Sequence, residues 1–238
     1  MRTRAFGESD KIVTFLTREF GKLSGIAKGA RKSRRRFVAS LEPFTHVQLG
    51  FRSRPQADLC FIESADIVRS ARKLAFDLDR YAYSTYVVEL IDSMVEGREA
   101  EPAVFDLAEA TLARIDGSAD SPSPLWLRQF EVELLALAGL EPRFDLCSRC
   151  RRPSAEPGKG FRFNPRTGCL CCDGCGDGSG IAVSEAAIVS MLLLQRGRPT
   201  ELPASAGGEV RALLQTFIAH HLRRPLRSPA LLREILGM

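Results

Sequence analysis

The sequence predicts an α+β protein in which an N-terminal β domain precedes a helical domain that carries a cysteine-rich insertion. Three observations lead to this prediction. Apolar residues alternate with polar ones through the first 70 residues, as in half-buried strands, and from about Ala71 they recur every three or four residues, as in amphipathic helices. Between Cys147 and Gly180 neither period is present, and Gly, Cys, Pro and Arg predominate.

The β domain is expected over residues 1–72. Short apolar runs at Ile12–Thr17 and Leu23–Lys28 are separated by a turn that contains glycine. A further strand is indicated by the strict alternation over residues 47–51. Several short strands in about 70 residues favour a small barrel or sandwich.

The helical domain is expected over residues 73–238, with the insertion at about 145–180. Its first helix is marked by an apolar stripe that consists of Leu74, Leu78, Tyr81, Thr85, Val88, Ile91 and Val95. Ser184 is the expected N-cap of a later helix that ends before Gly197 and Pro199. Further helices are expected over residues 103–115, 127–137, 185–195, 210–221 and 229–236.

Charge is distributed unevenly along the 238 residues, although the net charge is only +5. The first 75 residues contain 16 Lys and Arg against seven Asp and Glu, whereas the remainder is acidic. Such a basic third indicates a polyanionic partner, either nucleic acid or an acidic membrane surface. No apolar run is long enough for a membrane span and no secretory signal is present, so a cytoplasmic protein is expected.

Four of the seven cysteines form two CxxC pairs, Cys147 with Cys150 and Cys172 with Cys175, which 21 residues separate. Each pair can present two thiolates from one tight turn, and two such turns complete a tetrahedral zinc site. A site closed by four sulfurs has no open position for water or substrate, so a single structural Zn²⁺ is predicted.

Other uses of these thiols stay open at this point. Cys169 or Cys171 could replace Cys172 as the third ligand, although only Cys172 forms a CxxC pair with Cys175. An iron–sulfur cluster and unmetallated thiols are the competing interpretations.

A basic segment follows the second apolar run directly. Its cations are Lys28, Arg31, Lys32, Arg34, Arg35 and Arg36, six within nine residues. Like charges at this density repel one another, so a phosphate backbone that neutralises them explains the segment better than a stabilising role in the fold. A solvated basic loop is the alternative. Phe37 comes next and is a candidate platform on which a base of a single strand could stack.

Several segments together resemble the RecO family, the bacterial recombination-mediator proteins, across essentially the whole chain. They are Gly7-Glu-Ser-Asp-Lys-Ile-Val13, residues 17–21, 27–31, 36–37 and 41–44, the two CxxC pairs, and His221-Leu-Arg-Arg-Pro-Leu-Arg-Ser228. The resemblance implies an N-terminal OB-fold barrel, a C-terminal helical domain and the zinc-bearing insertion that most but not all members have. Members usually have an apolar strand ahead of the segment at Gly7, and only six residues precede it here. The expectation is a short first strand or a start that lies further upstream.

The resemblance also implies a function. The family binds single- and double-stranded DNA, anneals complementary strands coated by single-strand-binding protein, and works with RecR to load RecA onto gapped DNA. By position, the six cations of the basic segment and the four paired cysteines match the family's DNA contacts and metal ligands. The protein is then expected at the nucleoid, with RecR and the C-terminal tail of single-strand-binding protein as partners.

Catalysis is not expected, because no phosphate-cradling glycine loop, HExxH motif or nucleophile elbow is present. The alternative from another class is an RNA-binding or transcription-associated factor that combines an OB fold with a zinc ribbon. A zinc-dependent hydrolase is disfavoured because the expected metal site is closed.

Overall fold

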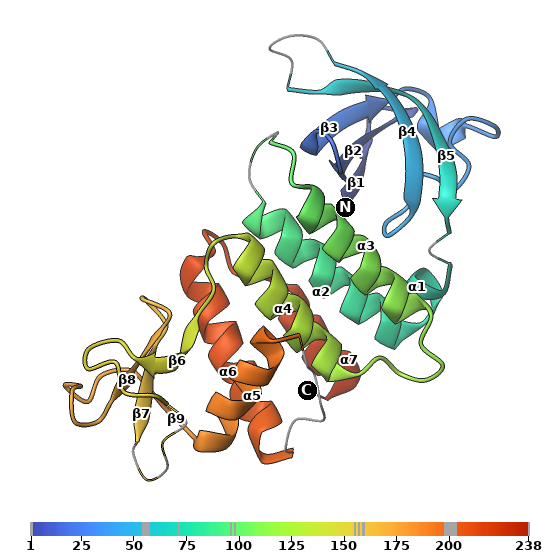
Figure 1. Cartoon of the computed structure of the whole chain (residues 1–238). Helices are drawn as coiled ribbons and strands as arrows, with labels where there is room; N and C mark the ends of the chain where they lie inside the picture. Colours follow the sequence, from blue (N-terminus) through green and yellow to red (C-terminus); the bar gives the residue numbers. More distant parts are fainter. Residues whose placement is uncertain are drawn as a thin grey trace. The chain divides into compact units, whose positions relative to one another are not determined.

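The computed structural model describes residues 2–53, 58–70, 72–95, 97, 99–154, 156, 158, 160–197 and 204–237 (Figure 1). The chain forms two compact units. Unit 1 contains residues 1–122 and 226–238, and unit 2 contains residues 123–225. The mixed α+β class predicted from the sequence is confirmed.

Five strands of unit 1 form one sheet in the order β1-β2-β3-β5-β4. They are β1 (Arg2–Phe6), β2 (Asp10–Thr17), β3 (Gly21–Ala27), β4 (His46–Arg52) and β5 (Cys60–Arg69). Neighbouring strands are antiparallel except β3 and β5, which are parallel. This arrangement fits a five-stranded, partly open OB-type barrel. The first strand has five residues, and each of them pairs with a residue of β2.

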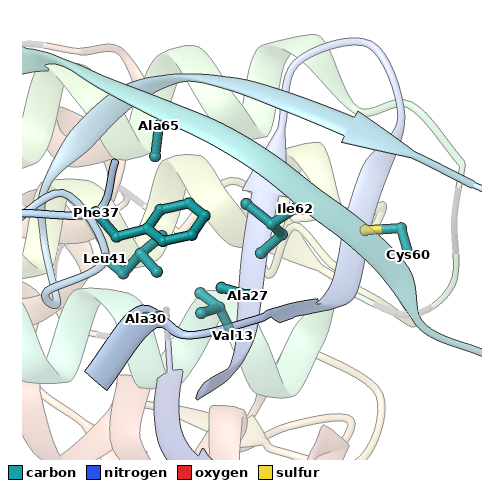
Figure 2. Close-up of a cluster of buried hydrophobic side chains, with 8 residues drawn as sticks. All are labelled: Val13, Ala27, Ala30, Phe37, Leu41, Cys60, Ile62 and Ala65. Atoms are coloured by element: carbon teal, nitrogen blue, oxygen red, sulfur yellow. The ribbon is translucent and has the colours of Figure 1, made fainter. Parts of the chain in front are cut away.

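The core of this sheet surrounds the ring of Phe37 with smaller apolar side chains. Figure 2 shows Phe37 and Leu41, from the segment after β3, beside Val13 of β2 and Ile62 of β5. Gly25 lets β3 approach β5, because a Cβ there would lie 2.7 Å from Cys60 Sγ and 2.9 Å from Ile62 Cγ1.

Helices α1 (Arg72–Phe76) and α2 (Leu78–Met94) follow the sheet and are separated at Asp77, whose carboxylate accepts a hydrogen bond from Arg80 N. Part of the predicted stripe is wrong, because Leu78 and Tyr81 are 70% and 39% exposed. The buried residues of α2 include Tyr83, Tyr86, Val87, Leu90 and Ile91, which recur every three or four residues along a neighbouring face of the same helix.

Unit 1 also contains α3 (Pro102–Asp116) and α7 (Ser228–Leu236), each with proline in its first turn as the sequence indicated. The Glu89 carboxylate on α2 accepts hydrogen bonds from the N–H groups of Arg227 and Ser228, which joins α7 to α2. The sheet contacts these helices through ion pairs such as Arg18 with Asp106. These contacts group α1–α3 and α7 with the sheet, across the boundary expected at residue 72.

Unit 2 combines three helices with a four-stranded sheet in the order β6-β8-β7-β9. The helices are α4 (Pro124–Leu137), α5 (Glu185–Gln195) and α6 (Ala204–His221), and the strands are β6 (Arg143–Cys147), β7 (Phe161–Asn164), β8 (Cys169–Cys172) and β9 (Ile181–Val183). The sequence indicated the helices but not this sheet, whose strands have only three to five residues. Ser184 caps α5 as predicted, whereas Pro199 lies outside the described residues.

Aromatic rings join the small sheet to α6 in unit 2. Phe144 on β6 stacks on Phe163 of β7 with centroids 4.9 Å apart, and Phe163 contacts Phe217 of α6 at 5.6 Å. All three side chains are buried. Among the described residues, the structure has no helix with the length and hydropathy of a membrane span.

Candidate metal centre and nucleic-acid interface

The small sheet of unit 2 brings four cysteines together at one end. Cys147 ends β6 and Cys172 ends β8, while Cys150 and Cys175 stand in the turns that follow these strands. Their four Sγ atoms lie within 4.8 Å of one another. The two CxxC pairs therefore converge, as their spacing indicated.

The sulfur geometry suits a tetrahedral ion. The Sγ atoms of Cys150 and Cys172 are 3.8 Å apart. A tetrahedron with Zn–S bonds of about 2.3 Å has an edge of about 3.8 Å between sulfurs. Four thiolates would give a site without an open coordination position.

Backbone N–H groups near the cluster favour the ionised form of one of its thiols. Burial opposes ionisation of Cys147, but hydrogen bonds from the backbone N–H groups of Cys150, Cys172 and Arg149 outweigh it and lower its pKa to about 6. Hydrogen bonds with the sulfurs of Cys150 and Cys172 raise the pKa of Cys175 to about 12. A metal ion that binds here would therefore find one ionised sulfur ready and displace protons from others.

The alternation of side chains along β8 also bears on the choice between the neighbouring cysteines. Side chains alternate across a strand, so Leu170 and Cys172 point to the buried side, and Cys169 and Cys171 are only partly buried on the other. Cys169 Sγ donates to the carbonyl of Thr167 at 3.3 Å. The alternation supports Cys172 over either neighbour as the third sulfur.

The basic loop, residues 28–36, follows β3 in unit 1. Gly29 adopts φ +68°, a conformation that glycine reaches without strain, and Ala30–Lys32 form one 3₁₀ turn. Asp10 Oδ1 accepts a hydrogen bond from Gly29 N at 2.8 Å, and Arg31 N donates to Ser9 O at 2.9 Å. The start of the loop is thus held against the turn between β1 and β2. The sequence carried no signal for this contact.

The six cations of the loop divide into two groups. Arg31 Nη1 donates to the carbonyls of Gly7 and Glu8, Arg36 Nη2 donates to the carbonyl of Lys28 at 2.6 Å, and Lys28 Nζ lies over the ring of Phe61. These three cations hold the loop. Lys32, Arg34 and Arg35 are exposed, and within the described part of the chain their side chains form no hydrogen bond or ion pair.

Phe37 does not occupy the position expected of a stacking platform. Its side chain is only 5% exposed and packs in the core of the sheet with Val13, Leu41 and Ile62 (Figure 2). The guanidinium of Arg36 covers it at 4.6 Å from the ring centroid. A base cannot reach this ring in the observed conformation, so Phe37 is a packing residue that anchors the end of the loop.

Comparison with known proteins matches both the N-terminal and the C-terminal part of the chain to one family. A family model described as "Recombination protein O N terminal" matches residues 1–71, and one described as "Recombination protein O C terminal" matches residues 75–230. Proteins described as "DNA repair protein RecO" from Anaeromyxobacter dehalogenans (strain 2CP-C) and Myxococcus xanthus (strain DK1622) are each 39% identical to the chain. These alignments cover 99% and 97% of this chain, and 94% and 93% of the relatives. A protein of the same description from Nocardioides sp. (strain ATCC BAA-499 / JS614) is 34% identical over 97% of this chain and 95% of its own.

Proposed function

This chain belongs to the recombination protein O family of DNA repair proteins, and we propose that it acts as a recombination mediator that catalyses no reaction. In this role it binds single- and double-stranded DNA and anneals complementary strands that are coated with single-strand-binding protein. Together with RecR it helps to load RecA onto gapped DNA.

The exposed cations of the basic loop are the observation that carries this proposal. Lys32, Arg34 and Arg35 present three positive charges from a segment whose backbone is held by Asp10, Arg31 and Arg36. Phosphates that meet these cations release condensed counterions, which gives affinity without dependence on sequence.

The same charges account for annealing without nucleotide hydrolysis. Two single strands repel each other through their phosphates, and cations between them lower that repulsion. Duplex formation is favourable by itself, at about 1.4 kcal/mol for each stacked step, so the protein has only to bring the strands together. No nucleotide site is required for this reaction.

The four clustered cysteines support one structural zinc ion in unit 2. Cys147, Cys150, Cys172 and Cys175 would hold it, and their donor set and 3.8 Å sulfur separation fit Zn²⁺. When bound, the ion supplies cross-links between the turns after β6 and β8 and no reactive water, because all four positions are filled by protein. Its contribution is to the stability of the small sheet.

The partners follow from the family. We expect RecR and the C-terminal tail of single-strand-binding protein to bind this chain, and RecA to be affected only indirectly. Because the substrate is chromosomal DNA, we place the protein at the nucleoid in the cytoplasm.

Annealing of two complementary oligonucleotides, each coated with the cognate single-strand-binding protein, tests the proposal. The reaction is followed without nucleotide at two salt concentrations, with RNA oligonucleotides of the same sequence as the control. Acceleration that weakens at the higher salt concentration is the expected result. Binding to single strands without any acceleration would refute the mediator role, and equal binding to RNA would favour an RNA-binding factor.

A further inference from the structure

Two cysteines of the insertion, Cys169 and Cys171, lie outside the four-sulfur cluster. They are two positions apart on β8, so they share the face of the strand opposite to Cys172, and both are partly exposed. Cys169 Sγ donates to the carbonyl of Thr167, just before the strand. A four-sulfur metal site requires neither of these two thiols.

Cys171 borders the cluster. Strand β6 lies beside β8 in parallel, and Cys147 stands opposite Leu170, the residue before Cys171. The sulfurs of Cys147 and Cys171 are close enough for a hydrogen bond between them. Cys171 also faces the turn after Cys175, because a Cβ on Gly176 would lie 3.7 Å from its Sγ. The Cys171 thiol is thus a fifth sulfur at the margin of the cluster.

The strand geometry allows a covalent bond between Cys147 and Cys171. Strands about 4.8 Å apart, with a rise of about 3.3 Å per residue, place such diagonal neighbours about 6 Å apart at Cα. Disulfides span Cα separations of about 4.4–6.8 Å. The bond can therefore form without separating β6 from β8.

We propose that Cys171 is a redox-responsive thiol, which a hydroperoxide converts into a disulfide with Cys147, so that the zinc ion is released. This inference rests on the zinc site of the proposed function and adds to it a control by oxidation. Cys147 is completely buried, whereas Cys171 is partly exposed. Of the two sulfurs, Cys171 is therefore the one that a small peroxide reaches first.

The reaction takes two steps. The O–O bond of the hydroperoxide breaks as one oxygen is transferred to the Cys171 sulfur, which gives a sulfenic acid at Cys171 and releases an alcohol or water. The Cys147 sulfur then attacks the Cys171 sulfur, the S–O bond breaks, and hydroxide leaves. In total, two electrons pass from the two sulfurs to the peroxide. A thiol reductant reverses the cross-link and regenerates both thiols.

The disulfide removes one of the four ligands from the metal site. Three remaining sulfurs hold the ion more weakly, and the stability that the ion gives to the small sheet is lost with it. The basic loop belongs to unit 1, so the affinity for DNA should persist while unit 2 loses stability. Oxidation would therefore act on the stability of the protein and not on its DNA contacts.

Treatment of the zinc-loaded, full-length protein with hydrogen peroxide tests this inference. Zinc release is followed with a metallochromic indicator, and the cross-link is identified by mass spectrometry of an unreduced tryptic digest. The expected species joins residues 144–149, which contain Cys147, to residues 167–196, which contain Cys171. Dithiothreitol should remove the cross-link and restore zinc binding.

Two serine variants provide the comparison. Cys171→Ser should keep its zinc, because Cys171 is not a ligand, and peroxide should release that zinc about tenfold more slowly than from the native protein. Cys169→Ser is the matched control, since it removes a thiol from the same face of β8 and should behave as the native protein does. Thermal unfolding before oxidation shows whether each variant is folded, and the cross-link in the native protein is measured without any variant.

The outcomes separate this inference from the zinc site itself. If the native protein binds zinc but Cys171→Ser releases it equally fast, the inference is refuted and the structural zinc stands. A disulfide of the exposed Cys150 with another ligand, in place of the expected cross-link, has the same meaning. If Cys171→Ser lacks zinc before oxidation, Cys171 is a metal ligand and the inference fails. A native protein that binds no zinc would refute both.

Discussion

Replacing Lys32, Arg34 and Arg35 together by alanine should flatten the salt dependence of DNA binding by a definite amount. Each cation that neutralises one phosphate contributes about 0.7 to the slope of log affinity against log salt on single strands and about 0.9 on duplex DNA. Three such contacts amount to a slope of about 2 on single strands and about 2.7 on duplex. Between 50 and 200 mM salt, the native protein should then lose about 20-fold more affinity for single strands than the variant does.

Fluorescence anisotropy with labelled oligonucleotides of several unrelated sequences measures this effect. The loss should be the same for every sequence, because phosphate contacts carry no sequence information. The fold is expected to survive, since these three side chains form no hydrogen bond or ion pair among the described residues. Thermal unfolding of the variant checks this directly.

A charge-matched control distinguishes the loop from the net charge of the protein. The variant Arg166→Ala/Arg196→Ala/Arg233→Ala removes three exposed arginines outside the loop. Its slope should stay close to the native value, since these arginines lie outside the loop to which the phosphate contacts are assigned. Equal slopes for the loop variant and the native protein would refute the assignment of phosphate contacts to the loop. Equal effects of the two triple variants would show that only overall charge matters.

Three further substitutions test the parts that support the interface. Cys147→Ser should remove the bound zinc and lower the stability of unit 2 by several kcal/mol, while the affinity for DNA is kept. Zinc analysis, calorimetry and fluorescence anisotropy measure these three quantities. A zinc-free variant with native stability would contradict the structural role of the ion. Phe163→Ala should lower the free energy of unfolding by about 3–5 kcal/mol in urea titrations, because its buried ring contacts Phe144 and Phe217. A loss below about 1 kcal/mol would show that these ring contacts do not join the small sheet to α6. Hydrogen bonds from Gly29 N and Ser9 hold the pKa of Asp10 below its ordinary value of 3.8. Its stabilising effect is therefore complete above about pH 4 and lost as the pH falls further, and thermal unfolding of Asp10→Asn should lack this step.

The features that the sequence predicted correctly depend on neighbours in the chain. Ser184 caps α5 through the N–H three residues later, and Pro102 begins α3, as local signals indicated. The approach of the two sulfurs within each CxxC pair is also a local feature, because it requires only one tight turn. The spacing of two residues therefore predicted which four sulfurs would meet.

The features that were missed depend on contacts between distant segments. Phe37 follows a run of cations, which suggested exposure, yet its ring fills a core formed by strands before and after it. The parallel register of β3 with β5 was missed as well, because it brings Ile26 opposite Phe61 across 35 residues of chain. Alternation within one strand predicts two faces but does not say which face is buried or which residues of other strands lie beside it.

The hydrogen-bond acceptors of the arginines in the basic loop explain how the loop can be ordered while its positive charge is not offset by carboxylates. Elsewhere in unit 1, cations such as Lys11, Arg18 and Lys22 pair with carboxylates. In the loop, Arg31 and Arg36 donate instead to backbone carbonyls, and no cation of residues 28–36 forms an ion pair in the part of the chain that the structure describes. Carbonyl acceptors fix the arginine side chains without cancelling their charge.

This choice of partner links the fold to DNA binding. A loop held by carboxylates would be ordered but nearly neutral, and phosphates would have to compete with those carboxylates for each cation. Among the described residues, the carboxylate that holds the loop is that of Asp10, which accepts hydrogen bonds from Gly29 N and Ser9 Oγ and forms no ion pair with a cation of the loop. The loop is therefore ordered before DNA arrives while its positive charge is retained, so less conformational entropy is lost when a phosphate backbone binds.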